Sequence, residues 1–158
     1  MLPGNWMTTL VLVIACAGGW LVGLAAADGD EEEASMTLEE VVELIEPFGE
    51  NCKPKPEKEN IVEMIKNKPD AKYETKCFRH CMLEQFELMP EGELKYNEDK
   101  TLEMMNMMFP DKEEHSPRII KGCNDQAGTD KCEVAHDIAM CMLREMRVSG
   151  YKIPEIKE

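Results

Sequence analysis

The segment CFRHC, from Cys77 to Cys81, places two thiols and the imidazole of His80 close together in the chain. In a helix these three side chains lie on adjoining parts of one face, where they could ligate a zinc ion. A redox-active thiol pair is disfavoured, because the C-x-x-x-C spacing differs from the C-x-x-C spacing that tunes such thiols. The third possibility is that each cysteine forms a disulfide with a distant partner, and the cellular compartment decides among the three.

The first 27 residues differ in kind from the rest of the chain. They contain no charged side chain, they carry the apolar run LVLVIACAGGWLVGLAAA, and they end in three alanines before Asp28. This pattern predicts a signal peptide over 1–27, followed by a single mature domain over 28–158. An uncleaved membrane anchor is the competing interpretation, since about 20 apolar residues span a bilayer. Secretion into an oxidising compartment disfavours free thiolates, so no metal site is predicted.

The mature domain carries the whole net charge of −14, because the first 27 residues are uncharged. Nucleic acids and anionic membranes require basic surfaces. The charge therefore argues against binding to nucleic acid and against stable membrane association. It favours a soluble protein that stays dispersed at high concentration. Together with the predicted secretion, the expectation is a monomer or a weak homodimer in an extracellular, lymph-like fluid.

Six cysteines remain once Cys16 leaves with the signal peptide: Cys52, Cys77, Cys81, Cys123, Cys132 and Cys141. An even count in a small secreted chain indicates a disulfide framework, for which 15 connectivities exist. Cys77 and Cys81 have parallel Cβ directions on one helical face, which is poor geometry for bonding each other. The same holds for Cys132 and Cys141 on a second helix. Each of these cysteines should bond to a different neighbour.

Apolar residues recur at helical spacing in six segments, and no alternating segment is long enough to predict a strand. A T-x-x-E capping box at Thr37 and Glu40 opens the first helix, and Pro47 kinks or ends it. The predicted helices are 38–48, a short one around 61–65, about 73–89, 99–109 ended by Pro110, from near 113 to 123, and about 130–147, ending at Gly150.

The cysteine intervals are 24, 3, 41, 8 and 8 residues. This spacing resembles the six-cysteine pattern of the insect odorant-binding proteins, the pheromone- and general-odorant-binding family. The x3 and final x8 intervals are its most specific elements. The segment CFRHCMLEQFELM, with the glycine-containing turn and the NEDK that follow, also resembles the third helix and the next loop of that family. The similarity covers about 28–158.

The resemblance implies an all-α fold, in which a compact bundle of about six helices is stapled by three disulfides around an internal hydrophobic cavity. It implies the pairs Cys52–Cys81, Cys77–Cys132 and Cys123–Cys141. In a chain-entropy treatment each bond contributes roughly 3 kcal/mol.

The function implied is that of a secreted, non-enzymatic carrier without cofactor. It would bind and solubilise odorants, pheromones or similar lipophiles and deliver them to a membrane odorant receptor. Eleven methionines remain after the signal peptide, several in MMNMMF, and flexible thioethers suit an adaptable apolar pocket. The three residues best supported by fixed offsets from motif cysteines are Leu83, Ile138 and Met142. The full set of expected wall residues is Leu83, Leu88, Met89, Leu102, Met105, Met108, Ile138 and Met142.

Two features stay open at this stage. Arg79 occupies a position where the family often has a small or apolar residue, so it faces solvent or meets a ligand carbonyl or carboxylate. The tail YKIPEIKE, 151–158, has three apolar anchors, and it either covers the cavity or ends as a solvated terminus.

Three further hypotheses compete with or extend the carrier. A secreted helical signalling or defence protein would act through its surface. A calcium-dependent lipid hydrolase would use His136 and Asp137, but the glycine-rich calcium loop and CC-x-x-H-D-x-C spacing of such enzymes are absent from the sequence. Histidine titration near pH 6.5 could control release through His80, His115 or His136. Ligand identity and tissue are not specified by the sequence.

Overall fold

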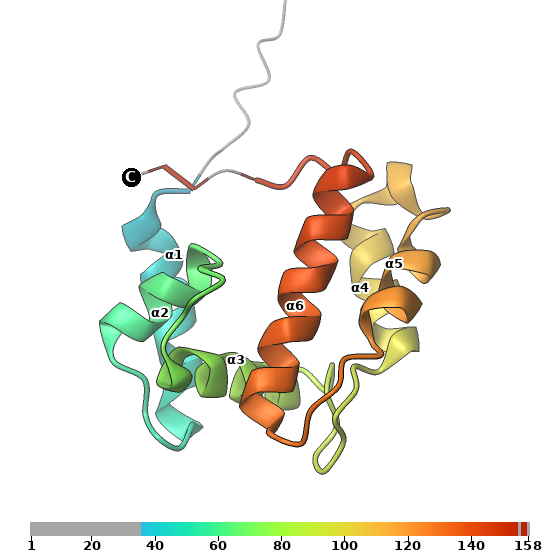
Figure 1. Cartoon of the computed structure of the whole chain (residues 1–158). Coiled ribbons are helices and arrows are strands. Elements are labelled where there is room, and N and C mark those ends of the chain that lie inside the picture. Colours follow the sequence, from blue (N-terminus) through green and yellow to red (C-terminus); the bar gives the residue numbers. More distant parts are fainter. Residues whose placement is uncertain (1–35, 155, 158) are drawn as a thin grey trace, which may run out of the picture. The chain divides into compact units, whose positions relative to one another are not determined.

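The computed structural model describes residues 36–154, 156 and 157, so the predicted signal peptide lies outside the described residues. This part of the chain contains six α-helices, two 3-10 helices and no strand beyond an isolated bridge between Thr37 and Lys157 (Figure 1). The all-α prediction is confirmed. No described helix is long and apolar enough to span a bilayer. The elements are α1 (Leu38–Ile45), η1 (Glu46–Asn51), α2 (Lys58–Ile65), α3 (Tyr73–Gln85), α4 (Glu98–Met108), η2 (Pro110–Lys112), α5 (Ser116–Cys123) and α6 (Lys131–Val148).

The first helix begins and ends where its sequence signals lie. The Thr37 hydroxyl accepts from the Glu40 backbone N–H at 3.3 Å, and the Glu40 carboxylate accepts from the Thr37 N–H at 2.7 Å. This is the predicted capping box. Since Pro47 has no N–H to donate, α1 ends at Ile45 and the chain tightens into η1.

The third helix is shorter than predicted, ending at Gln85 rather than near Met89. Glu87 adopts a positive φ of 54°, and the N–H groups of Leu88 and Met89 both donate to the Leu83 carbonyl, at 2.8 and 3.1 Å. The chain therefore reverses direction and folds Met89 inward, where it is fully buried. The apolar spacing in the sequence continues past Gln85 because Leu88 and Met89, in the turn, are buried as well.

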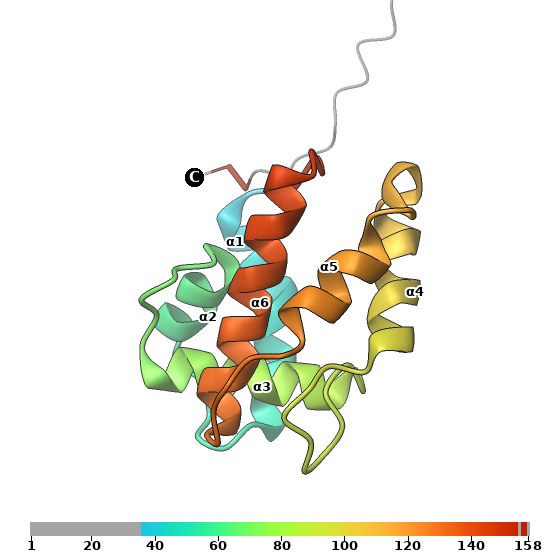
Figure 2. The same cartoon turned by 45° about the vertical axis from the view of Figure 1, so that its right-hand side comes forward.

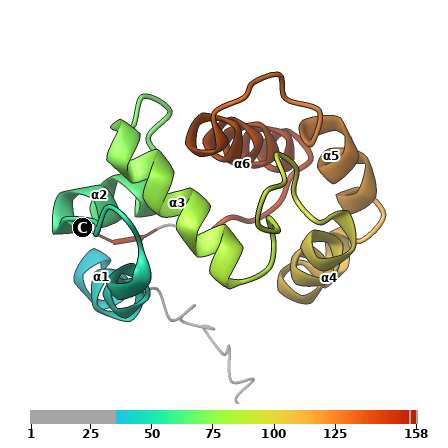
Figure 3. The same cartoon turned by 90° about the horizontal axis from the view of Figure 1, so that it is seen from below.

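The buried side chains form two clusters, and α3 contributes to both. Figures 2 and 3 show α3 passing between the α1–α2 pair and α6, with α4 and α5 beyond α6. The amino-terminal cluster is Val42, Cys52, Ile61, Met64, Ile65 and Phe78. The carboxy-terminal cluster is Met89, Tyr96, Met105, Ile119, Ile120, Cys123, Val134, Ala135, Ile138, Cys141, Met142 and Tyr151.

Three disulfides join different elements of this arrangement. Cys52–Cys81 connects the end of η1 to α3, Cys77–Cys132 connects α3 to α6, and Cys123–Cys141 connects α5 to α6. These are the pairs that the family resemblance implies. Because Cys77 and Cys81 bond to different partners, α3 is held covalently to both the amino-terminal and the carboxy-terminal helices.

Candidate functional site

The tail after α6 runs back to the start of the fold. Gly150, with a φ of 73°, ends α6, and the Tyr151 N–H closes the helix on the Met146 carbonyl at 3.0 Å. At the other end of the tail, the Leu38 N–H donates to the Lys157 carbonyl at 2.9 Å. The tail is thus attached to α6 and to α1.

Tyr151 fixes the beginning of the tail to α5. Its side chain is 6% exposed, and its ring contacts Phe109 edge-on, with centroids 5.2 Å apart. Its hydroxyl lies 3.0 Å from the Ser116 hydroxyl and donates to the Lys112 carbonyl at 3.2 Å. A buried phenol with both hydrogen bonds made is a rigid anchor.

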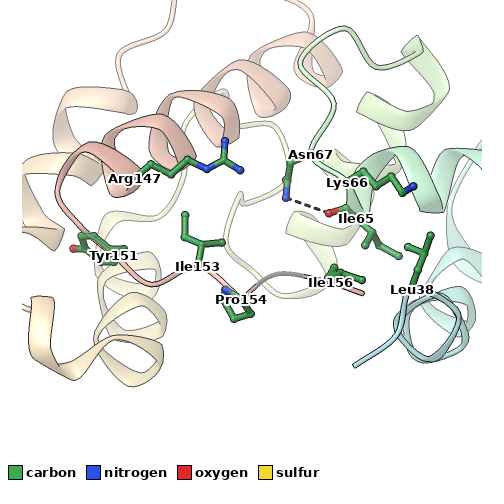
Figure 4. Close-up of a pocket in the computed structure, with 9 residues that line it drawn as sticks. All are labelled: Leu38, Ile65, Lys66, Asn67, Arg147, Tyr151, Ile153, Pro154 and Ile156. Carbon is green, nitrogen blue, oxygen red and sulfur yellow. Dashed lines mark hydrogen bonds between the residues drawn. The ribbon is translucent and has the colours of Figure 1, made fainter. Parts of the chain in front are cut away.

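A pocket of about 480 Å³ lies under the tail, and we call it the tail pocket (Figure 4). It is bounded by the first turn of α1, the end of α2, the last turns of α6 and the tail itself. The tail therefore forms a wall of a pocket, which the sequence had left undecided. The lining residues are Leu38, Ile65, Lys66, Asn67, Arg147, Tyr151, Ile153, Pro154 and Ile156.

The tail pocket combines apolar walls with positive charge. Lys66 and Arg147 contribute cations, Asn67 contributes an amide, and none of the described lining residues is acidic. The Asn67 amide donates to the Ile65 carbonyl at 3.2 Å, which turns its carbonyl oxygen toward α3. In a chain with a net charge of −14, this is a local reversal of charge.

The structure brings six of the eight expected wall residues together, in a place other than the tail pocket. Met89, Met105, Ile138 and Met142 are buried in the carboxy-terminal cluster, and Leu83 and Leu102 pack against it. None of them is among the lining residues of the tail pocket. The two regions meet at Tyr151, which belongs to the cluster and also lines the pocket.

The other two expected wall residues, Leu88 and Met108, lie apart from this group. Leu88 lines a separate groove of about 470 Å³ on the outer side of α4, with Phe86, Lys100, Glu103, Met104 and Met107. Met108 is 52% exposed. Helical periodicity explains why Met105 is buried and Met107, two residues later, faces outward. Met108 lies three residues from Met105 on the same side, but it is the last residue of α4 and is exposed.

The residues of the tail pocket were missing from the expected wall set. The signal for three of them was present in the sequence as the apolar anchors of the tail, Tyr151, Ile153 and Ile156. Leu38 and Ile65 gave no distinguishing signal, because their helical spacing is that of ordinary core residues.

Arg79 is half-buried, and its guanidinium turns toward the end of α2. Its Nη2 donates to the Met64 carbonyl and to the Asn67 side-chain carbonyl, both at 3.2 Å. Its Nε is buried and has no acceptor in the described part of the chain. Burial lowers the pKa of the Arg79 guanidinium from its usual value. The guanidinium lies directly behind Asn67, which lines the tail pocket.

His136 and Asp137 do not form a catalytic pair. The His136 ring is buried and its Nε2 lies 3.0 Å from the Pro69 carbonyl, so Nε2 carries the proton and donates. Its Nδ1 is buried without a partner among the described residues, and the Asp137 side chain is exposed. Among residues 36–154, 156 and 157, no group of three His, Cys, Asp or Glu side chains could hold a metal ion.

The buried histidines predict a loss of stability in mild acid. Burial lowers the folded-state pKa of His80 and of His136 below 6.5, and the neighbouring Glu84 carboxylate, 3.5 Å from His80, only partly offsets this. Below about pH 6.5 the unfolded chain therefore binds more protons than the folded protein. The free energy of unfolding is highest above that pH and falls as the pH drops, by up to about 1.4 kcal/mol per pH unit for each histidine. Urea unfolding at pH 7.5 and 5.5 measures it.

His136→Gln should flatten this dependence, because it removes one of the two groups. Equal urea midpoints at pH 7.5 and 5.5 in the unmodified protein would rule out buried neutral histidines as the cause of acid sensitivity.

Comparison with known proteins agrees with this architecture. The PBP/GOBP family matches residues 34–145. The chain is 22% identical to general odorant-binding protein 19d of Drosophila melanogaster over an alignment of 101 residues. This alignment covers 61% of this chain and 67% of that protein. Among solved structures it resembles the odorant-binding protein dmelOBP28a of Drosophila melanogaster, with a TM-score of 0.55 and 22% identity over 72% of this chain and 92% of that one.

The family match extends from just before α1 to the last turns of α6 and includes all six paired cysteines. The solved structure shows the same fold at low identity, as expected where covalent crosslinks and helix packing, rather than most surface residues, define the architecture. This chain belongs to the PBP/GOBP family of odorant-binding proteins.

Proposed function

We propose that the protein is a secreted carrier, which binds small hydrophobic molecules non-covalently, keeps them in solution and delivers them to a membrane receptor. The observation that carries the proposal is the tail pocket, whose volume of about 480 Å³ lies within the range of ligand sites, roughly 300–1,000 Å³. Three disulfides, which persist in oxidising compartments, and the uncharged apolar segment 1–27 support secretion.

The ligand is proposed to lie along the apolar side chains of the tail pocket. Burial of its apolar surface, at about 25 cal/mol per Å², supplies the main favourable term. Because Tyr151 is shared with the carboxy-terminal cluster, a longer ligand would reach Leu83, Ile138 and Met142 beyond it. Those residues, with Leu102, Met89 and Met105, remain our proposed inner wall.

Ile153→Glu should lower the affinity for an apolar probe at least tenfold, about 1.4 kcal/mol, because it buries a carboxylate against the ligand. Ile153 is only partly buried but packs against the carboxy-terminal cluster, so the free energy of unfolding should fall by about 1 kcal/mol, which leaves the protein folded. Titration with a fluorescent naphthylamine measures binding. Trp6 and Trp20 both lie within 1–27, so protein produced without that segment gives little background.

Val148→Glu is the matched control. Val148 is 79% exposed at the end of α6 and is not among the tail-pocket residues, so the same charge there should leave probe affinity unchanged. Absence of stoichiometric, competable probe binding by the unmodified protein would contradict the carrier function. It would favour a protein that acts through its surface, for which the exposed side chains of Phe86 and Met107 are the candidate contacts.

A further inference from the structure

We infer that the carrier's ligands bear a terminal carboxylate, and that the guanidinium of Arg79 recognises it through its unpaired Nε. This inference rests on the proposed carrier function and adds the chemical class of the ligand and its anchoring residue. It is specific to this chain, because nothing in the helix geometry of α3 requires a cation at this position.

Arg79 lacks a negatively charged partner in the described part of the chain. Arg79 has no carboxylate within ion-pair distance in the described part of the chain, and its only acceptors are the neutral oxygens of Met64 and Asn67. Its Nε is buried with no acceptor there at all. Arg79 as a residue is half-buried, but its Nε is shielded from water. A charged donor that has neither water nor an acceptor is costly, since nothing compensates its desolvation. A ligand that brings its own anion removes that cost.

The groups around Arg79 are not anions either. Burial raises the pKa of Tyr96, so this phenol stays protonated, and its hydroxyl donates to the Ala135 carbonyl at 2.9 Å. His136 is neutral at pH 7, because burial lowers its pKa and the Arg79 charge lowers it further. Within the described part of the chain, the partners of the Arg79 guanidinium are therefore dipoles rather than anions.

Capping of α2 is the competing explanation for Arg79. The Met64 carbonyl belongs to the last turn of α2, where the helix dipole favours a cation. This role uses Nη2 and leaves Nε without a partner. It accounts for one hydrogen bond, but not for the buried Nε donor that has no acceptor.

The geometry of the unused donor matches a carboxylate. Nε and Nη2 lie on one edge of the guanidinium, and two parallel N–H groups on that edge fit the two oxygens of a carboxylate. At present Nη2 donates to the Asn67 side-chain carbonyl at 3.2 Å. A ligand carboxylate that replaces this amide oxygen would accept from both Nε and Nη2.

Access to Arg79 runs through the tail pocket. Asn67 lines this pocket (Figure 4), and its side-chain carbonyl accepts from the Arg79 guanidinium, which does not itself line the pocket. Arg147, on the opposite wall, has no carboxylate partner in the described part of the chain and adds positive potential. An anionic head group would thus enter past Arg147 and stop at Arg79, while its hydrocarbon chain lies against Ile65, Ile153 and Ile156.

Displacement of the naphthylamine probe by matched fourteen-carbon ligands tests the inference at pH 7.5. In the unmodified protein, tetradecanoic acid should bind at least tenfold more tightly than tetradecanol, tetradecanal or methyl tetradecanoate. Arg79→Met should retain probe and alcohol binding and lose the preference for the acid. Arg118→Met, which removes an exposed arginine of α5 that hydrogen-bonds Ser149, is the charge control and should retain it.

The possible outcomes distinguish failure of the carboxylate assignment from failure of the proposed carrier function. Probe binding with equal displacement by acid and alcohol overturns the carboxylate assignment and leaves the carrier intact. A preference for the aldehyde or ester that is lost in Arg79→Met also overturns it, in favour of carbonyl recognition. Failure of the unmodified protein to bind the probe overturns the proposed function itself.

A second measurement covers the case in which Arg79→Met does not fold. Carboxyl-labelled tetradecanoic acid bound to the unmodified protein should titrate, by carbon NMR, at a lower pH than a carboxyl group free in water, because the guanidinium stabilises the anion. A structural role for Arg79 would not produce this shift. A bound carboxyl group with an unshifted or raised pKa contradicts the inference.

Discussion

Replacing Cys77 and Cys132 together by alanine should remove about 4 kcal/mol from the free energy of unfolding. The bond closes a loop with a sequence separation of 55 residues, the longest of the three, and chain-entropy arguments assign the largest stabilisation to the longest loop. Total stabilities of small domains are about 5–15 kcal/mol, so the loss is a large fraction of the whole. Urea unfolding followed by circular dichroism measures it.

The matched control is the alanine pair at Cys123 and Cys141, whose bond spans 18 residues and should contribute about 3 kcal/mol. The Cys77–Cys132 bond also joins α3 to α6, so its loss should loosen the packing of these two helices, which carry Arg79 and His136. A smaller destabilisation from the 55-residue loop than from the 18-residue loop would show that native packing, rather than chain entropy, sets the contribution of these bonds.

Ile138→Ala should cost about 3–4 kcal/mol of stability. Its side chain is fully buried in the carboxy-terminal cluster, and removing its methyl and methylene groups loses their transfer free energy and leaves a cavity. Met107→Ala is the matched control on the outer face of α4. Met107 is 76% exposed, so the change there should stay within about 0.5 kcal/mol. Thermal and urea unfolding compare the two variants.

The same variant tests where the ligand lies. If the ligand stays within the tail pocket, Ile138→Ala should change probe affinity less than threefold, because Ile138 does not line that pocket. A loss of tenfold or more, with the folded state still populated, would place the ligand against the carboxy-terminal cluster and favour the wall that the sequence predicts. For this one variant, the change in stability tests the burial of Ile138, and the change in probe affinity tests where the ligand lies.

The sequence alone predicted the features that depend on local chemistry or on covalent spacing. The Thr37–Glu40 capping box is satisfied within four residues, so no distant contact is needed to form it. The end of α1 before Pro47 follows from a missing N–H. The resemblance carried by the cysteine intervals implied the three pairs that the structure contains.

Features that depend on distant contacts were beyond the sequence. The early end of α3 at Gln85 requires Leu88 and Met89 to bond back to Leu83, and apolar periodicity does not distinguish that turn from continued helix. Met105 and Met108 are the same residue type on one side of α4, yet Met105 is buried and Met108, the last residue of the helix, is exposed.

The local chain therefore determined the helices, their caps and, through the cysteine spacing, the family of the fold. Tertiary structure alone decided that the tail forms a wall of a pocket and that the Arg79 guanidinium turns toward the end of α2, beside Asn67. The physical reason is that pockets and unpaired charges arise where elements distant in the sequence meet. Residues from α1, α2, α6 and the tail line one pocket. The local sequence of any one of these four segments does not indicate that it will pack beside the other three.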